Sequence, residues 1–133
     1  PNDGDPVEKI MEMTKGGVHH AIECLGLKIT AEQCFEMLAV GGTATIVGMV
    51  PVGQKIELDG FAFLRERKIQ GSSMGSNRFR TDMPHLIDLY LQGRLHLDDW
   101  ISDKLQLSEI NDGFKAMKEG RTVRSLIDFG IAS

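Results

Sequence analysis

The chain has 133 residues, a formal net charge of −4, 41% hydrophobic residues and two cysteines. This length suits one ordinary domain, and a negative chain without a basic stripe is a poor nucleic-acid binder. No apolar run approaches the roughly 18 residues that a membrane-spanning helix needs. Two cysteines without a C-x-x-C spacing exclude a disulfide scaffold and a four-cysteine zinc site, and they suit a reducing, cytoplasmic setting.

The N-terminal residues do not resemble a targeting segment. They lack the basic-then-apolar order of a signal peptide, and the sequence begins with Pro1 instead of Met. We therefore expect a part of a longer protein.

Helical and strand signals alternate through the first half of the chain. Asp5 is expected to cap a first helix that ends at Gly16, and Thr30 with Gln33 to cap a second that ends at Gly41. β-branched and apolar runs predict buried strands, and a short helix is expected before the last of them. The expected strands are residues 18–25, 43–49 and 68–74, and the short helix is 61–67. This order predicts an α/β fold with a parallel sheet and right-handed crossovers.

The second half has a different pattern, which places a boundary near residue 74. Thr81 is expected to cap a helix that closes at Gly93, and a later helix should turn Ile110, Phe114 and Met117 inward. Short strands are expected over residues 100–105 and 123–129.

Three features indicate a ligand. Gly48 follows a predicted parallel strand, where open α/β sheets bind ligands and where a glycine lets a flat ring approach the backbone. The segment 71–75 repeats this arrangement with small polar residues between two glycines. Arg124 is the one cation in the apolar run 123–127, so it needs an anionic partner. That partner is either an internal carboxylate or a bound phosphate.

Five segments of the chain form a recognisable series: G-V-H-H-A-I-E-C-L-G (17–26), G-G-T-A-T-I-V-G-M (41–49), D-M-P-H-L-I-D-L-Y (82–90), I-N-D-G-F (110–114) and M-K-E-G-R-T-V-R (117–124). In order and spacing they resemble the medium-chain, zinc-type alcohol dehydrogenases. The resemblance covers residues 5 to 129 and omits the family's G-x-G-x-x-G and zinc-ligand regions.

The resemblance implies a fold class and a division of the chain. Residues 1–73 would form the second mononucleotide half of an NAD-binding Rossmann domain, a parallel sheet with flanking helices. Residues 74–133 would form a C-terminal helix and strand segment that returns to the catalytic domain.

The resemblance also implies roles for nine residues, all of them in cofactor binding. Val47, Gly48 and Met49 match a segment whose backbone binds the nicotinamide carboxamide, and Ser72, Ser73 and Met74 match a second such segment. Cys24 and Leu25 match positions beside the adenosine half, and Arg124 matches an arginine that pairs with the pyrophosphate. No catalytic residue and no metal ligand is expected in this chain.

The function expected from the resemblance is a share in an NAD-dependent, zinc-containing alcohol dehydrogenase that converts an alcohol to an aldehyde or ketone. NADP is not excluded, zinc would be bound outside this chain, and a homodimer or higher homo-oligomer is expected. Two alternatives stay open: a zinc-free quinone or enoyl reductase of the same superfamily, and a stand-alone binding or dimerisation module. Arg124 and the I-N-x-x-F motif favour the zinc type.

Overall fold

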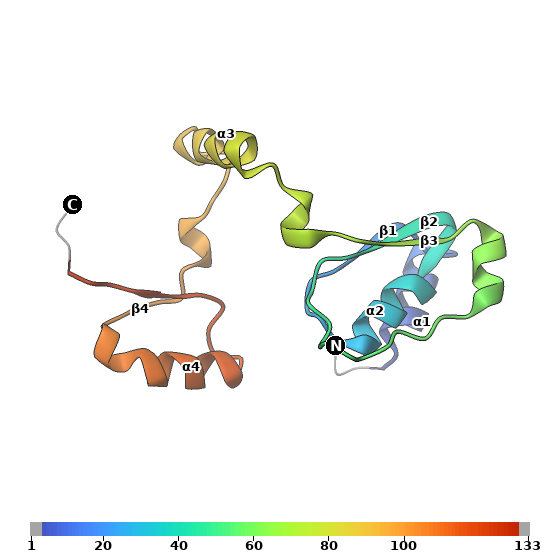
Figure 1. The fold of residues 1–133 in the computed structure, drawn as a ribbon, viewed down its shortest axis with the longest axis horizontal. Coiled ribbons are helices and arrows are strands. Elements are labelled where there is room, and N and C mark those ends of the chain that lie inside the picture. Colours follow the sequence, from blue (N-terminus) through green and yellow to red (C-terminus); the bar gives the residue numbers. More distant parts are fainter. Residues whose placement is uncertain (1–3, 131–133) are drawn as a thin grey trace. The chain divides into compact units, whose positions relative to one another are not determined.

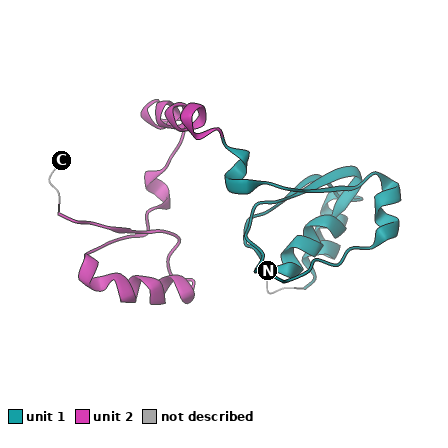
Figure 2. Cartoon of the chain, viewed as in Figure 1, with its two compact units in different colours: residues 1–77 teal, residues 78–133 magenta. Residues whose placement is uncertain are grey.

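The chain folds as two units, which Figure 2 draws in different colours. The computed structural model describes residues 4–130, and the units comprise residues 1–77 and 78–133. None of the helices in the described range has the length and hydrophobicity that a membrane span requires.

The first unit is a three-stranded parallel sheet in the order β1-β2-β3. In chain order the unit contains α1 (Pro6–Thr14), β1 (Val18–Glu23), α2 (Lys28–Glu36), β2 (Leu38–Ile46), a 3-10 helix (Gly60–Arg65) and β3 (Lys68–Gly71). α1 and α2 lie on the same side of the sheet (Figure 1). The predicted α/β class with a parallel sheet is confirmed.

The core of this unit lies between the sheet and α2. Ala21 and Ala44 are register partners on β1 and β2, and both are buried. Phe35 of α2 is 2% exposed and packs on Phe63, with ring centroids 4.9 Å apart. Ile22, on the opposite face of the sheet, is 66% exposed. The small alanines let α2 approach the sheet closely enough to bury Phe35.

The second helix differs from the prediction at both ends. It begins at Lys28 after Leu27, so the predicted Thr30–Gln33 capping box is wrong. The Thr30 hydroxyl instead donates to Glu23 Oε1 at 2.7 Å. A helix that ended at Gly41 is also wrong, because β2 already begins at Leu38.

Gly42 belongs to β2 for a steric reason. The β1–β2 register shifts between Val18 and His20, and a Cβ on Gly42 would lie 2.8 Å from the Val18 carbonyl oxygen. Gly42 therefore allows β1 and β2 to approach closely. In the sequence alone, a glycine at this position has the same pattern as one that ends a helix.

The second unit contains two helices and a two-stranded parallel sheet. Its main elements are α3 (Phe79–Leu91), β4 (Asp103–Leu105), α4 (Ile110–Lys118) and β5 (Ser125–Ile127). Both strands are shorter than predicted, since Trp100 lies in a 3-10 turn and Arg124 precedes β5. Thr81 does not cap α3, which begins two residues earlier, and the Asp82 carboxylate accepts from the Arg78 amide at 2.6 Å.

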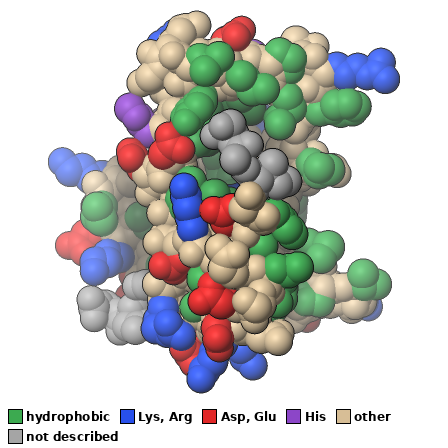
Figure 3. Space-filling model, turned by 90° about the vertical axis from the view of Figure 1, so that its left-hand side faces the viewer, with side chains coloured by type: hydrophobic (Ala, Val, Ile, Leu, Met, Phe, Trp, Pro, Cys, Tyr) green, Lys and Arg blue, Asp and Glu red, His purple; other side chains and the backbone are tan. Residues whose placement is uncertain are grey.

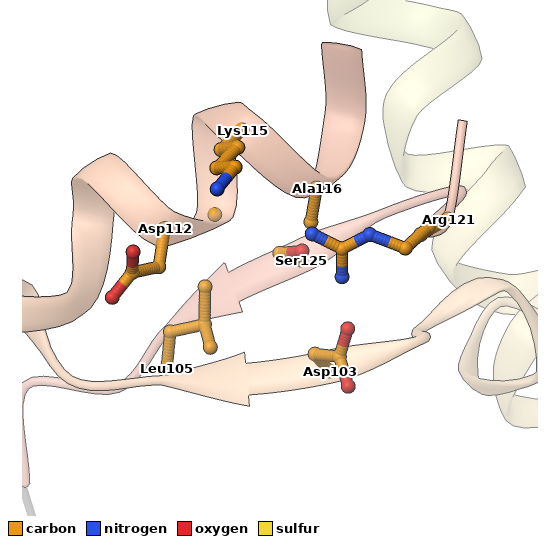
Figure 4. A pocket seen from close by; sticks show the side chains of 8 residues that line it. Asp103, Leu105, Asp112, Lys115, Ala116, Arg121 and Ser125 are labelled. Atoms are coloured by element: carbon orange, nitrogen blue, oxygen red, sulfur yellow. The ribbon is translucent and has the colours of Figure 1, made fainter. Parts of the chain in front are cut away.

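α4 faces its sheet with its smallest residue. Gly113 is buried, and a Cβ on it would lie 2.7 Å from Leu105 Cδ1 of β4. Phe114 and Met117 are 61% and 54% exposed, so the prediction that they point inward is wrong within the described part of the chain. A cavity of about 370 Å³ lies beside this contact, with Lys115 from α4 and Asp103 from β4 in its lining (Figure 4).

Candidate functional site

The carboxyl ends of β1, β2 and β3 lie side by side. Ile46 of β2 pairs with Glu23 of β1 on one side and with Gly71 of β3 on the other. The segment after each strand carries predicted site residues. These are Cys24 and Leu25 after β1, Val47, Gly48 and Met49 after β2, and Ser72, Ser73 and Met74 after β3. The structure thus brings eight of the nine predicted residues to one edge of the sheet, which we call the strand-end edge.

The segment after β2 is held against the end of β1. The Val47 and Gly48 amides both donate to the Glu23 carbonyl oxygen, at 2.8 and 3.0 Å. Among residues 4–130, no hydrogen bond reaches the Val47 carbonyl or the Met49 amide. Met49 is 88% exposed. A backbone acceptor and a backbone donor are therefore free for a ligand at this edge.

Two glycines let the segments after β1 and β2 touch through their backbones. A Cβ on Gly26 would lie 2.6 Å from the Met49 carbonyl oxygen. A Cβ on Gly48 would collide with the Gly26 amide nitrogen and with Glu23 Oε2. Packing within the chain therefore already requires a residue without a side chain at position 48, whether or not a ligand binds there.

Glu23 is the buried carboxylate beneath this contact. Its residue is 2% exposed, and Oε1 accepts from the Leu25 and Gly26 amides, each at 2.8 Å, besides the Thr30 hydroxyl. Burial opposes ionisation of the carboxyl, but the Thr30 hydroxyl and the neighbouring backbone amides hold the pKa of Glu23 below its usual value. Oε2 is buried without a hydrogen-bond partner among the described residues.

The segment after β3 begins parallel to the segment after β2. The Ser72 amide donates to the Ile46 carbonyl at 2.9 Å, which extends the pairing by one residue. The chain then turns sharply, because Met74, Gly75 and Ser76 all have positive φ. Met74 is 85% exposed, and the Ser72 and Ser76 hydroxyls lie 3.0 Å apart.

Arg124, the ninth predicted residue, belongs to the second unit. It is exposed and precedes β5, so the prediction that it sits inside a buried strand is wrong. Its side chain lines a cavity of about 480 Å³ with Trp100 and three aliphatic residues. No carboxylate in residues 4–130 lies within ion-pair distance of it. Because Arg124 is exposed, burial does not require an anionic partner for it. Its guanidinium has no internal carboxylate partner among the described residues and is open to a ligand.

Sequence reasoning missed Glu23. Its signal was present, because Glu23 is the one acid in the run 18–25 and stands where a parallel strand leaves the sheet. The same rule that singled out Arg124, a charge inside an apolar run, applies to Glu23 with equal force.

The metal-ligating and thiol side chains of the described residues are scattered. No group of three or more His, Cys, Asp or Glu within residues 4–130 is arranged to hold a metal ion. Cys24 is exposed, and burial raises the pKa of Cys34, which disfavours its thiolate. What the strand-end edge can do is bind and orient a ligand through backbone groups.

A parallel sheet in the order β1-β2-β3 with flanking helices, as in the first unit, is the arrangement of a Rossmann-type fold. Comparison with known proteins identifies the family. The sequence pattern of the zinc-binding dehydrogenases matches residues 1–92. The chain belongs to this family, the zinc-type medium-chain alcohol dehydrogenases.

Individual relatives agree with this placement. Geraniol dehydrogenase of Carpoglyphus lactis is 35% identical over 126 residues, which is 95% of this chain and 33% of the relative. Benzyl alcohol dehydrogenase from Acinetobacter calcoaceticus superposes with a TM-score of 0.87 at 29% identity, over 94% of this chain and 34% of that one. A zinc-binding dehydrogenase from Sinorhizobium meliloti, solved with NADP bound, gives 0.73 at 33% identity, over 84% and 33%. The chain spans about a third of the length of the curated relatives it matches.

Proposed function

We propose that this chain supplies the nicotinamide side of the cofactor site in an NAD-dependent, zinc-containing alcohol dehydrogenase. Residues 1–73 are the second half of its Rossmann domain, and residues 74–133 belong to its catalytic domain. The observation that carries the proposal is the convergence of three segments at the strand-end edge of a parallel sheet. The enzyme oxidises an alcohol to an aldehyde or ketone and works as a homodimer or higher homo-oligomer.

The backbone of the strand-end edge fits a nicotinamide carboxamide. A carboxamide presents an NH2 donor and a carbonyl acceptor, so its binding site needs both an acceptor and a donor. The free Val47 carbonyl and Met49 amide offer this pair within one segment. Gly48 between them lets the flat ring approach the chain, and Ser72 to Met74 line the neighbouring strand end.

The remaining predicted residues serve the rest of the cofactor. Cys24 and Leu25 stand beside the adenosine half, and the Arg124 guanidinium holds the pyrophosphate, for which its planar fork of N–H donors is suited. NAD is the proposed cofactor, and NADP, which one structural relative contains, is the alternative.

The part of this chain in the reaction is to bind and orient. The nicotinamide, when bound, accepts the hydride that leaves the alcohol carbon. The described residues present no donor set for zinc, and the zinc of the proposed enzyme would be held outside them. Rigid backbone groups that fix the carboxamide hold one face of the nicotinamide ring toward the substrate. This orientation lowers the entropic cost of reaching a reactive geometry.

The test is Gly48→Ala in the full-length protein, with Gly60→Ala as the matched control. A Cβ on Gly60 meets nothing within 4 Å, whereas a Cβ on Gly48 collides with Gly26 and Glu23. Segment 47–49 must shift to accommodate the Cβ, and returning it to the binding geometry would restore overpacking strain of about 1–3 kcal/mol. The dissociation constant for NAD⁺ should therefore rise about 5- to 150-fold. Isothermal titration calorimetry measures it, and Gly60→Ala should match the wild type. Equal NAD⁺ affinity in all three proteins would refute the proposed site.

A further inference from the structure

Glu23 joins three parts of the first unit at one point. Its carboxylate accepts from the Leu25 and Gly26 amides after β1 and from Thr30 in the first turns of α2. Its carbonyl oxygen accepts from the Val47 and Gly48 amides after β2. One residue therefore fixes the segment after β1 through its side chain and the segment after β2 through its backbone.

The two segments also support each other directly. Gly26 lies against the Met49 backbone, and Gly48 lies against both Gly26 and the Glu23 carboxylate. The segment 47–49 therefore rests on a surface formed by segment 24–26, and that surface holds its shape through the Glu23 carboxylate. If the Leu25 and Gly26 amides lose the Glu23 carboxylate as their acceptor, segment 24–26 can shift. Gly48 and Met49, which pack against Gly26, then lose the contact that holds them in place.

We propose that Glu23 is a positioning residue that locks segments 24–26 and 47–49 into one rigid unit, so that the two halves of the cofactor meet a preformed surface. The effect of Glu23 on cofactor binding rests on the proposed function above. The coupling of segments 24–26 and 47–49 depends only on contacts within this chain. A ligand-binding backbone that is already ordered loses less conformational entropy on binding.

Replacing Glu23 with Gln isolates the carboxylate with almost no change of shape. The amide oxygen can take the place of Oε1 but carries no charge, so its bonds to three donors are weaker. The amide NH2 then occupies the place of Oε2, where no described acceptor is present, which leaves buried donors unpaired. Both effects loosen segment 24–26, and through it segment 47–49.

The first arm of the test is amide hydrogen exchange in the full-length protein without cofactor. Glu23→Gln should speed exchange at Val47 and Gly48 by about tenfold or more, because their bonds to the Glu23 carbonyl open when the support moves. Ala44 in the core of β2 should be unchanged. Glu32→Gln is the matched control, since the Glu32 carboxylate is also hydrogen-bonded but serves Glu57 and Lys28. Should Glu23→Gln fail to fold, Thr30→Val removes a single donor and should give a smaller change of the same sign.

The outcomes of this arm are distinct. Faster exchange confined to Leu25 and Gly26 would overturn the proposal, because the carboxylate would then order only its own loop. Equally faster exchange at Ala44 would also overturn it, since that result reports a general loss of stability.

The second arm measures the dissociation constants of NAD⁺ and ADP-ribose. Glu23→Gln should weaken both ligands by about tenfold, because NAD⁺ contacts both coupled segments and ADP-ribose contacts the one beside the adenosine half. Glu32→Gln should bind both ligands like the wild type. Unchanged constants in a Glu23→Gln protein with faster Val47 exchange would overturn the positioning role. A wild-type protein that binds neither NAD⁺ nor NADP⁺ refutes the proposed function instead, and the exchange arm still decides whether the two segments are locked.

Discussion

At the scale of single residues, Glu23 couples the stability of the protein to pH. Its carboxyl pKa is lowered in the folded state from 4.5, so the unfolded chain binds the proton more tightly. The contribution of the ionised carboxylate to stability is therefore complete above about pH 5 and is lost as the pH falls through the lower folded pKa.

Denaturant unfolding of the wild type and of Glu23→Gln between about pH 3 and pH 7 measures this contribution. The difference in the free energy of unfolding should be constant near neutrality and shrink below the ordinary carboxyl pKa of 4.5. If the difference in the free energy of unfolding stays constant down to the lowest pH, ionisation of Glu23 does not contribute to stability.

Arg124 gives a second prediction at this scale. Its guanidinium is exposed and has no carboxylate partner among residues 4–130, so Arg124→Ala should leave the melting temperature almost unchanged. Charged hydrogen bonds contribute about 1.5–3 kcal/mol, so the NAD⁺ dissociation constant should rise about 10- to 150-fold. Turnover at saturating cofactor should fall much less, because the pyrophosphate is remote from the reacting carbon.

Calorimetry and thermal unfolding on the same Arg124→Ala protein separate this account from an internal ion pair. A clear fall in melting temperature together with an unaltered NAD⁺ dissociation constant would mean that Arg124 stabilises the fold and does not bind the cofactor.

At the scale of elements, two buried glycines should respond differently to the same substitution. A Cβ on Gly42 meets the Val18 carbonyl oxygen, a backbone atom held in the β1–β2 pairing. A Cβ on Gly113 meets only the end of the Leu105 side chain, which can rotate away.

Gly42→Ala should therefore destabilise the protein by about 1–3 kcal/mol. Gly113→Ala should be within about 1 kcal/mol of the wild type, because alanine also favours the helix. Urea unfolding measures both, and the opposite order of the two effects would contradict the packing described for β2 and α4.

These glycines show what the sequence could predict and what it could not. The alternation of patterns predicted every strand of the first unit, because a buried parallel strand needs a continuous apolar run. It misread Gly41 and Gly42 as the end of a helix, because composition cannot distinguish a helix stop from a close strand approach. Thr30 was misread similarly: its hydroxyl bonds Glu23, a partner seven positions away that a local capping rule does not consider.

At the scale of the whole molecule, periodicity predicted which helix faces are apolar but not what they contact. Phe114 and Met117 have the helical spacing of a buried face, yet they are exposed in the described chain. Figure 3 likewise shows hydrophobic side chains over much of the face that it draws. A spacing pattern shows that a face favours burial, whereas its partner depends on the rest of the fold.

The candidate site was predictable to a similar degree. Eight of the nine predicted residues lie together because parallel strands end at the same edge, which follows from topology alone. The placement of Arg124 does not follow, since it belongs to a different unit of the chain. The sequence could single out Glu23 as the one acid in the run 18–25, but it could not show that the Leu25 and Gly26 amides and the Thr30 hydroxyl all donate to its carboxylate.

If the strand-end edge binds the nicotinamide cofactor, NAD⁺ should protect the backbone of that edge from exchange with solvent. Amide hydrogen exchange of the full-length protein, recorded with and without saturating NAD⁺, maps the backbone that the cofactor covers. We predict slower exchange in segments 24–25, 47–49 and 72–74 and around Arg124, with exchange at Ala44 of β2 unchanged. NAD⁺ binding that slows exchange elsewhere and leaves these segments unaltered would contradict it.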